Sequence, residues 1–155
     1  MKIPFLKILF VFCMLTFFTA CSNDDDSPNE TILEYNELSE ACKSIIETHF
    51  PEATVVLVER KNVPDSDGTV FEVKLNNGME IDFNAECNWT DIDGNNQRIP
   101  YALIRENIIV YVQTNYPEPI FIKGIDKENF GFEVELSNEL DLIFDTNGEF
   151  VRIDP

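Results

Sequence analysis

The feature that most constrains the fold is an internal duplication. The segment FEVKLNN at residues 71–77 recurs 61 positions later as FEVELSN at residues 132–138, with five of the seven residues identical. Upstream, THFPE at residues 48–52 recurs 66 positions later as TNYPE at residues 114–118. A loop-like run at 63–68 accounts for the changed offset, because loops tolerate insertions. The chain is therefore predicted to hold two copies of one unit of roughly sixty residues, a size that forms a marginal core alone.

Each copy contains runs in which apolar and polar residues alternate. In the second copy the alternation extends from Phe130 to Leu136 and from Leu140 to Asp145, and a short apolar run follows at 150–153. A period of two places the apolar side chains on one face of a sheet and the acids on the other. Turn-forming residues separate these runs, which predicts an antiparallel meander. The other predicted strands cover 54–59, 69–75, 79–83 and 89–92, the last at a sheet edge, and 120–126.

A helix is expected before the strands of each copy. In the first copy the apolar spacing predicts an amphipathic helix that Pro51 ends. Its buried stripe is Leu38, Ala41, Cys42, Ile45, Ile46 and Phe50. In the second copy Pro100 is expected in the first turn, and the stripe is Ile104, Ile108, Tyr111, Val112 and Tyr116. The β-branched run 108–110 locally favours a strand, but the match with the first copy favours the helix.

These elements predict an α+β protein of two tandem repeats, each a helix packed on a four-stranded antiparallel sheet. The first repeat is expected over residues 37–97 and the second over 98–155. The two sheets are either separate or joined into one curved surface.

The first twenty residues are predicted to be a lipoprotein signal peptide. Two lysines precede an apolar run at 8–18 that is too short for a membrane span and is typical of a secretory signal. The sequence Phe18-Thr19-Ala20-Cys21 resembles a bacterial lipoprotein box, although Phe18 stands where Leu, Val or Ile is usual. By that resemblance Cys21 becomes the acylated first residue of the mature protein. The alternative is an ordinary secretory signal with Cys21 as a plain thiol.

Residues 21–36 are predicted to be a flexible acidic tether, since a polar, acidic, proline-containing run cannot bury enough surface to order itself. Its acidic run resembles the surface-export signal of Bacteroidetes lipoproteins. The expected location is therefore the cell envelope, anchored by lipid at the outer membrane and facing either the periplasm or the outside. Contact with the membrane is expected only through the lipid on Cys21.

The net charge of −18 argues against a nucleic-acid partner, because binding phosphates requires a basic face. It permits divalent cations or a basic protein surface as partners. Two of the four cysteines, Cys13 and Cys21, belong to the signal and the lipid site. The remaining pair, Cys42 and Cys87, lies in an oxidising compartment, where a disulfide is one alternative. We favour the other, a core thiol at Cys42 and a partly exposed thiol in the turn at Cys87.

The sequence offers little that points to catalysis or to a metal site. No nucleophile–base arrangement, zinc motif or phosphate loop is readable, so we expect no catalytic residues, no metal site and no cofactor. The lone histidine, His49, falls at a helix end and is expected to have no functional role. Asp91-x-Asp93-x-Asn95 resembles the start of a calcium loop, but the glycine and the final glutamate of such loops are missing, which favours an ordinary turn. The outward rows of acids are predicted to be solvated faces.

Three segments of the second copy resemble the PepSY-like family, whose members are called β-lactamase-inhibitor-like. They are Asn115-Tyr116-Pro117, Glu133–Leu136 and Phe144–Phe150. The first copy matches less well, with Asn84 in place of the aspartate and Cys87 in place of the glycine. The resemblance covers about residues 37–155 and implies tandem helix-on-sheet units similar to the β-lactamase inhibitor protein. It also implies a secreted or lipidated protein of Bacteroides or a relative.

The expected function is a non-catalytic envelope lipoprotein that binds a protein or peptide through its sheet face or its loops. The alternative is a module that responds to calcium or another cation through the acid rows or through Asp91 to Asn95. Some members of the family that the chain resembles are described as calcium-regulated periplasmic proteins.

Overall fold

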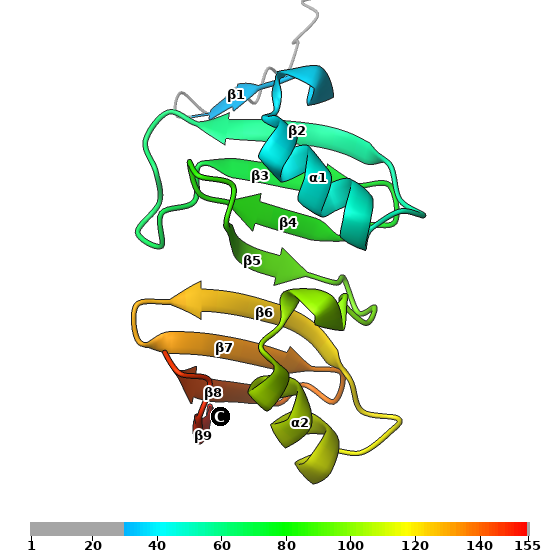
Figure 1. The fold of residues 1–155 in the computed structure, drawn as a ribbon, viewed down its shortest axis with the longest axis vertical. Coiled ribbons are helices and arrows are strands. Elements are labelled where there is room, and N and C mark those ends of the chain that lie inside the picture. Colours follow the sequence, from blue (N-terminus) through cyan, green and yellow to red (C-terminus); the bar gives the residue numbers. More distant parts are fainter. Residues whose placement is uncertain (1–29, 155) are drawn as a thin grey trace, which may run out of the picture.

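The computed structural model describes residues 30–154, which form one antiparallel sheet covered on one side by two helices (Figure 1). Neighbouring strands pair in chain order from β1 to β9. The elements are β1 (Glu30–Ile32), η1 (Tyr35–Glu37), α1 (Glu40–His49), β2 (Val55–Lys61), β3 (Phe71–Leu75), β4 (Glu80–Phe83), β5 (Trp89–Asp93), η2 (Tyr101–Leu103), α2 (Glu106–Asn115), β6 (Ile122–Glu128), β7 (Gly131–Leu136), β8 (Asp141–Asp145) and β9 (Phe150–Asp154). Both halves therefore follow the same order: a 3-10 turn, a helix and four strands.

The alternating strands place one continuous apolar core under both helices. Cys42 and Ile46 of α1 and Ile108 and Val112 of α2 are almost completely buried, and they belong to the same cluster as the inward side chains of the strands. Full burial of side chains of this size contributes about 1.5–3 kcal/mol each. The helical prediction for residues 108–110 is confirmed, because α2 contributes its apolar stripe to this core.

The duplication extends to the hydrogen bonds of equivalent turns. In the β8–β9 turn Oδ1 of Asp145 accepts from the backbone N–H groups of Asn147 and Glu149, at 2.8 and 2.9 Å. In the β4–β5 turn Oδ1 of Asn84 accepts from the N–H groups of the matching residues, at 3.1 and 2.9 Å. An amide oxygen therefore replaces the carboxylate of the second copy without loss of the turn.

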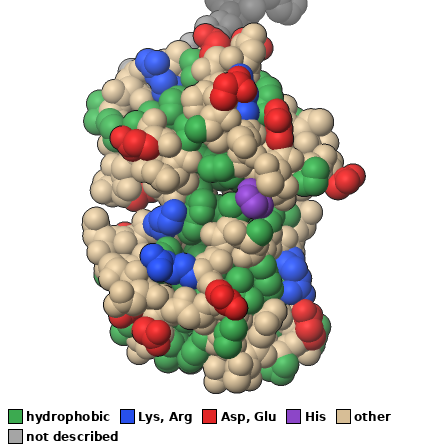
Figure 2. Space-filling view, in the orientation of Figure 1, with side chains coloured by type: hydrophobic (Ala, Val, Ile, Leu, Met, Phe, Trp, Pro, Cys, Tyr) green, Lys and Arg blue, Asp and Glu red, His purple; other side chains and the backbone are tan. Residues whose placement is uncertain are grey.

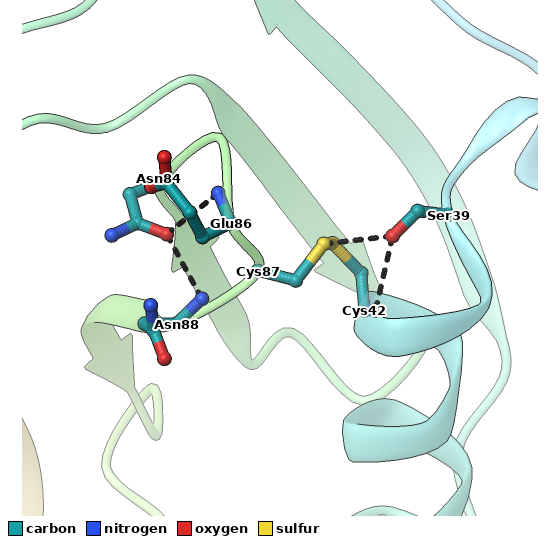
Figure 3. Close-up of a disulfide and its surroundings, with 6 residues drawn as sticks. All are labelled: Ser39, Cys42, Asn84, Glu86, Cys87 and Asn88. Atoms are coloured by element: carbon teal, nitrogen blue, oxygen red, sulfur yellow. Dashed lines mark hydrogen bonds between the residues drawn. A yellow bond between two sulfur atoms is a disulfide. The ribbon is translucent and has the colours of Figure 1, made fainter.

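The same turns are linked to their helices in two different ways. In the first copy Cys42 of α1 and Cys87 form a disulfide (Figure 3), so the preference for two separate thiols is wrong. In the second copy Nδ2 of Asn107 on α2 donates to the backbone oxygens of Asn147 and Gly148, at 2.9 and 2.8 Å. The position of Cys87 in the turn, which suggested partial exposure, directs its side chain towards the start of α1, and its exposed fraction is only 4%.

Three boundaries differ from the expectation. β5 was expected at an edge but pairs with β6, which joins the four strands of each copy; together with β1 they form one nine-stranded sheet within residues 30–154. The predicted tether over 21–36 ends too late, because Glu30–Ile32 pairs with β2 and the Glu30 carboxylate lies 3.6 Å from Lys61 Nζ. Pro100 precedes a separate 3-10 turn rather than opening α2.

Candidate functional site

The helix-free face of the sheet carries two rows of carboxylates that cross most of its strands. The strand register pairs Glu59 with Glu72, Glu72 with Asp82, Asp91 with Asp126, and Asp126 with Glu133. In the second row Glu80 pairs with Asp93, and Asp141 pairs with both Glu135 and Asp154. We call this surface the acid face; it comprises Glu59, Glu72, Glu80, Asp82, Asp91, Asp93, Asp126, Glu133, Glu135, Asp141 and Asp154. Like charges directly opposite one another destabilise a sheet, so this arrangement costs free energy unless something offsets it.

Basic residues offset the charge towards both ends of the acid face but not at its centre. At the β9 end Arg152 forms an ion pair with Asp154, and the other ion pairs involve two lysines at the β2 end. Lys61 forms ion pairs with Glu30, Asp65 and Glu72. Lys74 lies 3.4 Å from Glu59 and 3.7 Å from Glu80. Among residues 30–154 no ion pair involves Asp82, Asp91 or Asp126, which lie on neighbouring strands at the centre of the sheet.

These three central aspartates bind their protons unusually tightly. Burial, then the negative charge of Glu72 and Asp91, raises the pKa of Asp82 to about 8. Burial, then the neighbouring Asp126 carboxylate, raises the pKa of Asp91 to about 7. Burial, then Glu128, raises the pKa of Asp126 to about 6. The centre of the acid face therefore exchanges protons near neutral pH.

Two oxygens of this centre have no hydrogen-bond partner within the described part of the chain. They are Oδ1 of Asp82 and Oδ1 of Asp126, and both are buried. A buried polar atom left unpaired costs about 1–3 kcal/mol. The prediction that the outward acids form merely solvated faces is therefore incomplete, because the middle of the surface is partly desolvated and unsatisfied. Alternation in the sequence identified the face but could not tell which strands would be central.

The other sequence-predicted site residues do not form a site. Asp91 and Asp93 lie on β5 rather than in a loop, and Asp93 Oδ1 accepts from the Asn95 N–H at 2.7 Å, so the calcium-loop resemblance corresponds to a strand and a turn. In residues 30–154 no group of three or more His, Cys, Asp or Glu side chains has an arrangement that could hold a metal ion. His49 ends α1. Cys21 lies outside the described residues.

The helix side has a different character. Figure 2 shows apolar side chains gathered between the two halves on this side, with lysine or arginine beside them. Each copy also forms a hollow between its 3-10 turn and the end of its helix, lined by Tyr35, Glu47 and Phe50 in the first and by Tyr101 and Tyr116 in the second, with volumes of about 400 and 380 Å³. No helix among the described residues is long and apolar enough to cross a membrane.

Comparison with known proteins gives matches of family and of structure. A family model described as "Putative beta-lactamase-inhibitor-like, PepSY-like" matches residues 28–81 and 69–152. No curated protein matches the chain.

Among solved structures, a "putative calcium-regulated periplasmic protein" from Bacteroides thetaiotaomicron is similar at 27% identity and a TM-score of 0.73, covering 81% of this chain and 97% of its own. A "putative periplasmic protein of unknown function" from Bacteroides vulgatus is similar at 28% identity and a TM-score of 0.74, covering 82% and 100%. A further B. vulgatus periplasmic protein, of the DUF2874 family, is similar at 27% identity and a TM-score of 0.73, covering 85% and 99%.

Proposed function

Because the chain belongs to the PepSY-like family of β-lactamase-inhibitor-like proteins, we propose that it is a non-catalytic binding protein of the cell envelope. Its ligand is a cationic segment of another protein or peptide, and its binding surface is the acid face. The observation that carries this proposal is the centre of that surface, where Asp82 and Asp126 each keep a buried oxygen that has no hydrogen-bond partner among residues 30–154. Lysine or arginine side chains would supply the missing donors and lower the pKa of the central aspartates.

The envelope location is supported by the periplasmic relatives and agrees with the signal peptide predicted from residues 1–20. We place the chain at the outer membrane, held by a lipid on Cys21. Replacement of Cys21 by Ala is expected to move the protein from the membrane fraction to the soluble envelope fraction, as blotting of both fractions would reveal. A variant that stays in the membrane fraction would contradict lipid anchoring.

The binding proposal is tested by titrating a lysine-rich decapeptide into the full chain and measuring affinity by calorimetry. At about pH 9, above the raised pKa values of both residues, the double variant Asp82→Asn/Asp126→Asn removes two charges from the centre of the acid face. A matched control, Glu86→Gln/Glu149→Gln, removes the same charge from two exposed hairpin turns. We expect the first variant to weaken binding about tenfold or more and the control to leave it within about twofold, since only the first alters the desolvated centre. An equal loss of peptide affinity in both variants would mean that the peptide is attracted non-specifically to a protein with a net charge of −18, and it would refute the proposal.

A second candidate function is a response to calcium. It is favoured by the relative described as calcium-regulated. Since residues 30–154 contain no ready group of three ligands, calcium would bind to single carboxylates of the acid face. A ligand that binds only the native state must stabilise it, by about 2.7 kcal/mol at one hundred times its dissociation constant. Thermal melts with and without 1 mM calcium separate the two candidates, because an unchanged midpoint would leave only the cationic peptide.

A further inference from the structure

The outer edge of β9 corresponds to the edge of β5 that pairs with β6. We call the β5–β6 pairing, which joins the two halves of the sheet, the joint. β5 and β9 have the same length and are 61 residues apart, so Trp89, Asp91 and Ile92 correspond to Phe150, Arg152 and Ile153. The pairing of β4 with β5 contains a register shift, and the pairing of β8 with β9 contains a shift of the same kind. The outer edge of β5 pairs with β6, whereas no strand of residues 30–154 pairs with the outer edge of β9.

The exposure of equivalent side chains shows that β6 covers apolar side chains of β5 whose counterparts on β9 are exposed. Ile92 is 0% exposed beside Ile125 of β6, but its counterpart Ile153 is 46% exposed and the neighbouring Val151 is 56% exposed. A strand edge also leaves alternate backbone N–H and C=O groups unpaired on its open side. β9 therefore presents both apolar and hydrogen-bonding surface that a further antiparallel strand would cover.

The internal joint also indicates which side chains such a strand needs. Ile125 lies opposite Ile92, and Asp126 lies opposite Asp91. Lys127 places its Nζ 3.4 Å above the centre of the Trp89 ring and donates to the Trp89 carbonyl oxygen at 2.6 Å. On β9 the aromatic ring is Phe150, which stacks on Tyr111 with centroids 4.5 Å apart.

One substitution changes the charge pattern of the edge. The position of Asp91 is taken by Arg152, whose side chain is 52% exposed and forms an ion pair with Asp154 of the same strand. An acidic residue of an incoming strand, which would face a like charge on β5, faces an opposite charge on β9. The open edge is thus complementary to the sequence aliphatic–acidic–basic, read along an antiparallel strand.

We propose that the outer edge of β9 binds an extended segment of another polypeptide that presents an aliphatic, an acidic and a basic side chain in succession. The aliphatic residue lies opposite Ile153, the acid opposite Arg152, and the basic side chain reaches over Phe150. This surface meets the acid face at Asp154 but lies strands away from the Asp82, Asp91 and Asp126 centre. Its ligand is selected by strand pairing and by order of side chains rather than by net positive charge.

The test uses the nine-residue peptide IFIKGIDKE, which copies residues 120–128 and contains equal numbers of acidic and basic residues. It is titrated into the isotopically labelled full chain in a mild detergent, with amide chemical shifts and hydrogen exchange as readouts. We expect saturable shifts and slowed exchange centred on β9. The variant Arg152→Glu should weaken binding about fivefold, since a favourable cross-strand pair becomes an unfavourable one. A peptide with Lys in place of its aspartate should restore the affinity of that variant.

The other outcomes overturn the proposal. Shifts centred on β5 would mean that the peptide displaces β6 from its own joint. Loss of binding in Asp82→Asn/Asp126→Asn would place the peptide on the acid face. Concentration-dependent shifts of β9 without peptide would mean that the edge pairs with a second copy of this chain. No saturable binding up to millimolar peptide would mean that the edge takes no strand of this chemistry.

Discussion

The link between Cys42 and Cys87 yields the sharpest test of the fold. Its two cysteines are 45 residues apart and close a loop that contains α1, β2, β3 and β4. Both side chains are buried, so the link joins the start of the helix to the turn after β4 inside the core. The perturbation is reduction of the disulfide, with the double variant Cys42→Ala/Cys87→Ala as a form that cannot re-oxidise.

The size of the effect follows from the length of the loop. In the chain-entropy model, cross-linking residues at this separation lowers the entropy of the unfolded chain by an amount that stabilises the fold by about 4 kcal/mol. For a domain of this size, that corresponds to a fall of about 15 °C in the melting midpoint when the link is lost. The alanine variant should lose somewhat more, because it also leaves space where two sulfur atoms were packed.

The measurement is urea unfolding followed by circular dichroism, for the oxidised protein, the reduced protein and the variant. Comparing the two redox forms of the same sequence isolates the link, since every side chain is otherwise unchanged. Alkylation of the unfolded, unreduced protein followed by mass spectrometry should modify neither Cys42 nor Cys87. Alkylation of both residues would mean that the disulfide is absent. A fall of less than about 1 kcal/mol in the free energy of unfolding on reduction would mean that the disulfide does not stabilise the first copy as argued.

Two further predictions concern charge and backbone. A carboxyl whose pKa is raised in the fold holds its proton more tightly there than in the unfolded chain, so the free energy of unfolding should fall as pH rises from about 4 to 8, the range spanned by Asp82, Asp91 and Asp126. Asp82→Asn should flatten this profile in urea titrations and add about 1–2 kcal/mol at pH 8, whereas Glu86→Gln in an exposed turn should not. Gly131 has a φ of +147°, and a Cβ there would overlap the carbonyl oxygen of Phe144, so Gly131→Ala should cost about 3 kcal/mol. Gly68 has open space around it, so Gly68→Ala should cost about 1 kcal/mol, and thermal melts of both variants would compare them.

The elements of this fold were predictable because they are encoded locally. Alternation marks the strands, and the spacing of apolar residues marks α1. The match with the first copy predicts the helical state of residues 108–110, where propensity alone points the other way. A strand pattern states which face a side chain takes, but it does not state which strand lies alongside. The central place of β5, and with it the desolvation of Asp91, depends on a contact with β6 that no local signal records.

The disulfide was missed for a related reason. Cys87 occupies the place of Gly148, and glycine at that position of the second copy suggested an open turn. In the structure the backbone of Cys87 keeps the positive φ of the glycine, at +61° against +82°, while its side chain reaches the helix. The two copies thus preserve the link between turn and helix and change only its chemistry, from the hydrogen bonds of Asn107 to a covalent bond.

The joint between β5 and β6 decides whether the two copies unfold separately or together. Its pairing covers only three residues of each strand, from Asp91 to Asp93 on β5. Yet Ile92 and Ile125 are 0% and 1% exposed, and they belong to the one apolar cluster that lies under both helices. Separation of the copies would expose these side chains and the open edges of two strands at once, a cost comparable to the whole stability of a unit of sixty residues.

We therefore expect the chain to unfold in a single transition, although it is built from two similar units. Ile125→Ala should lower the stability of both copies equally, by about 2–4 kcal/mol, because it opens a cavity at a site that both share. Hydrogen exchange of the amides of β3 and β7 measures each copy independently, and Trp89 fluorescence reports on the joint itself, since Lys127 lies over its ring. If exchange accelerated in β7 but not in β3, the copies would be separate folding units and the continuous core would not couple them.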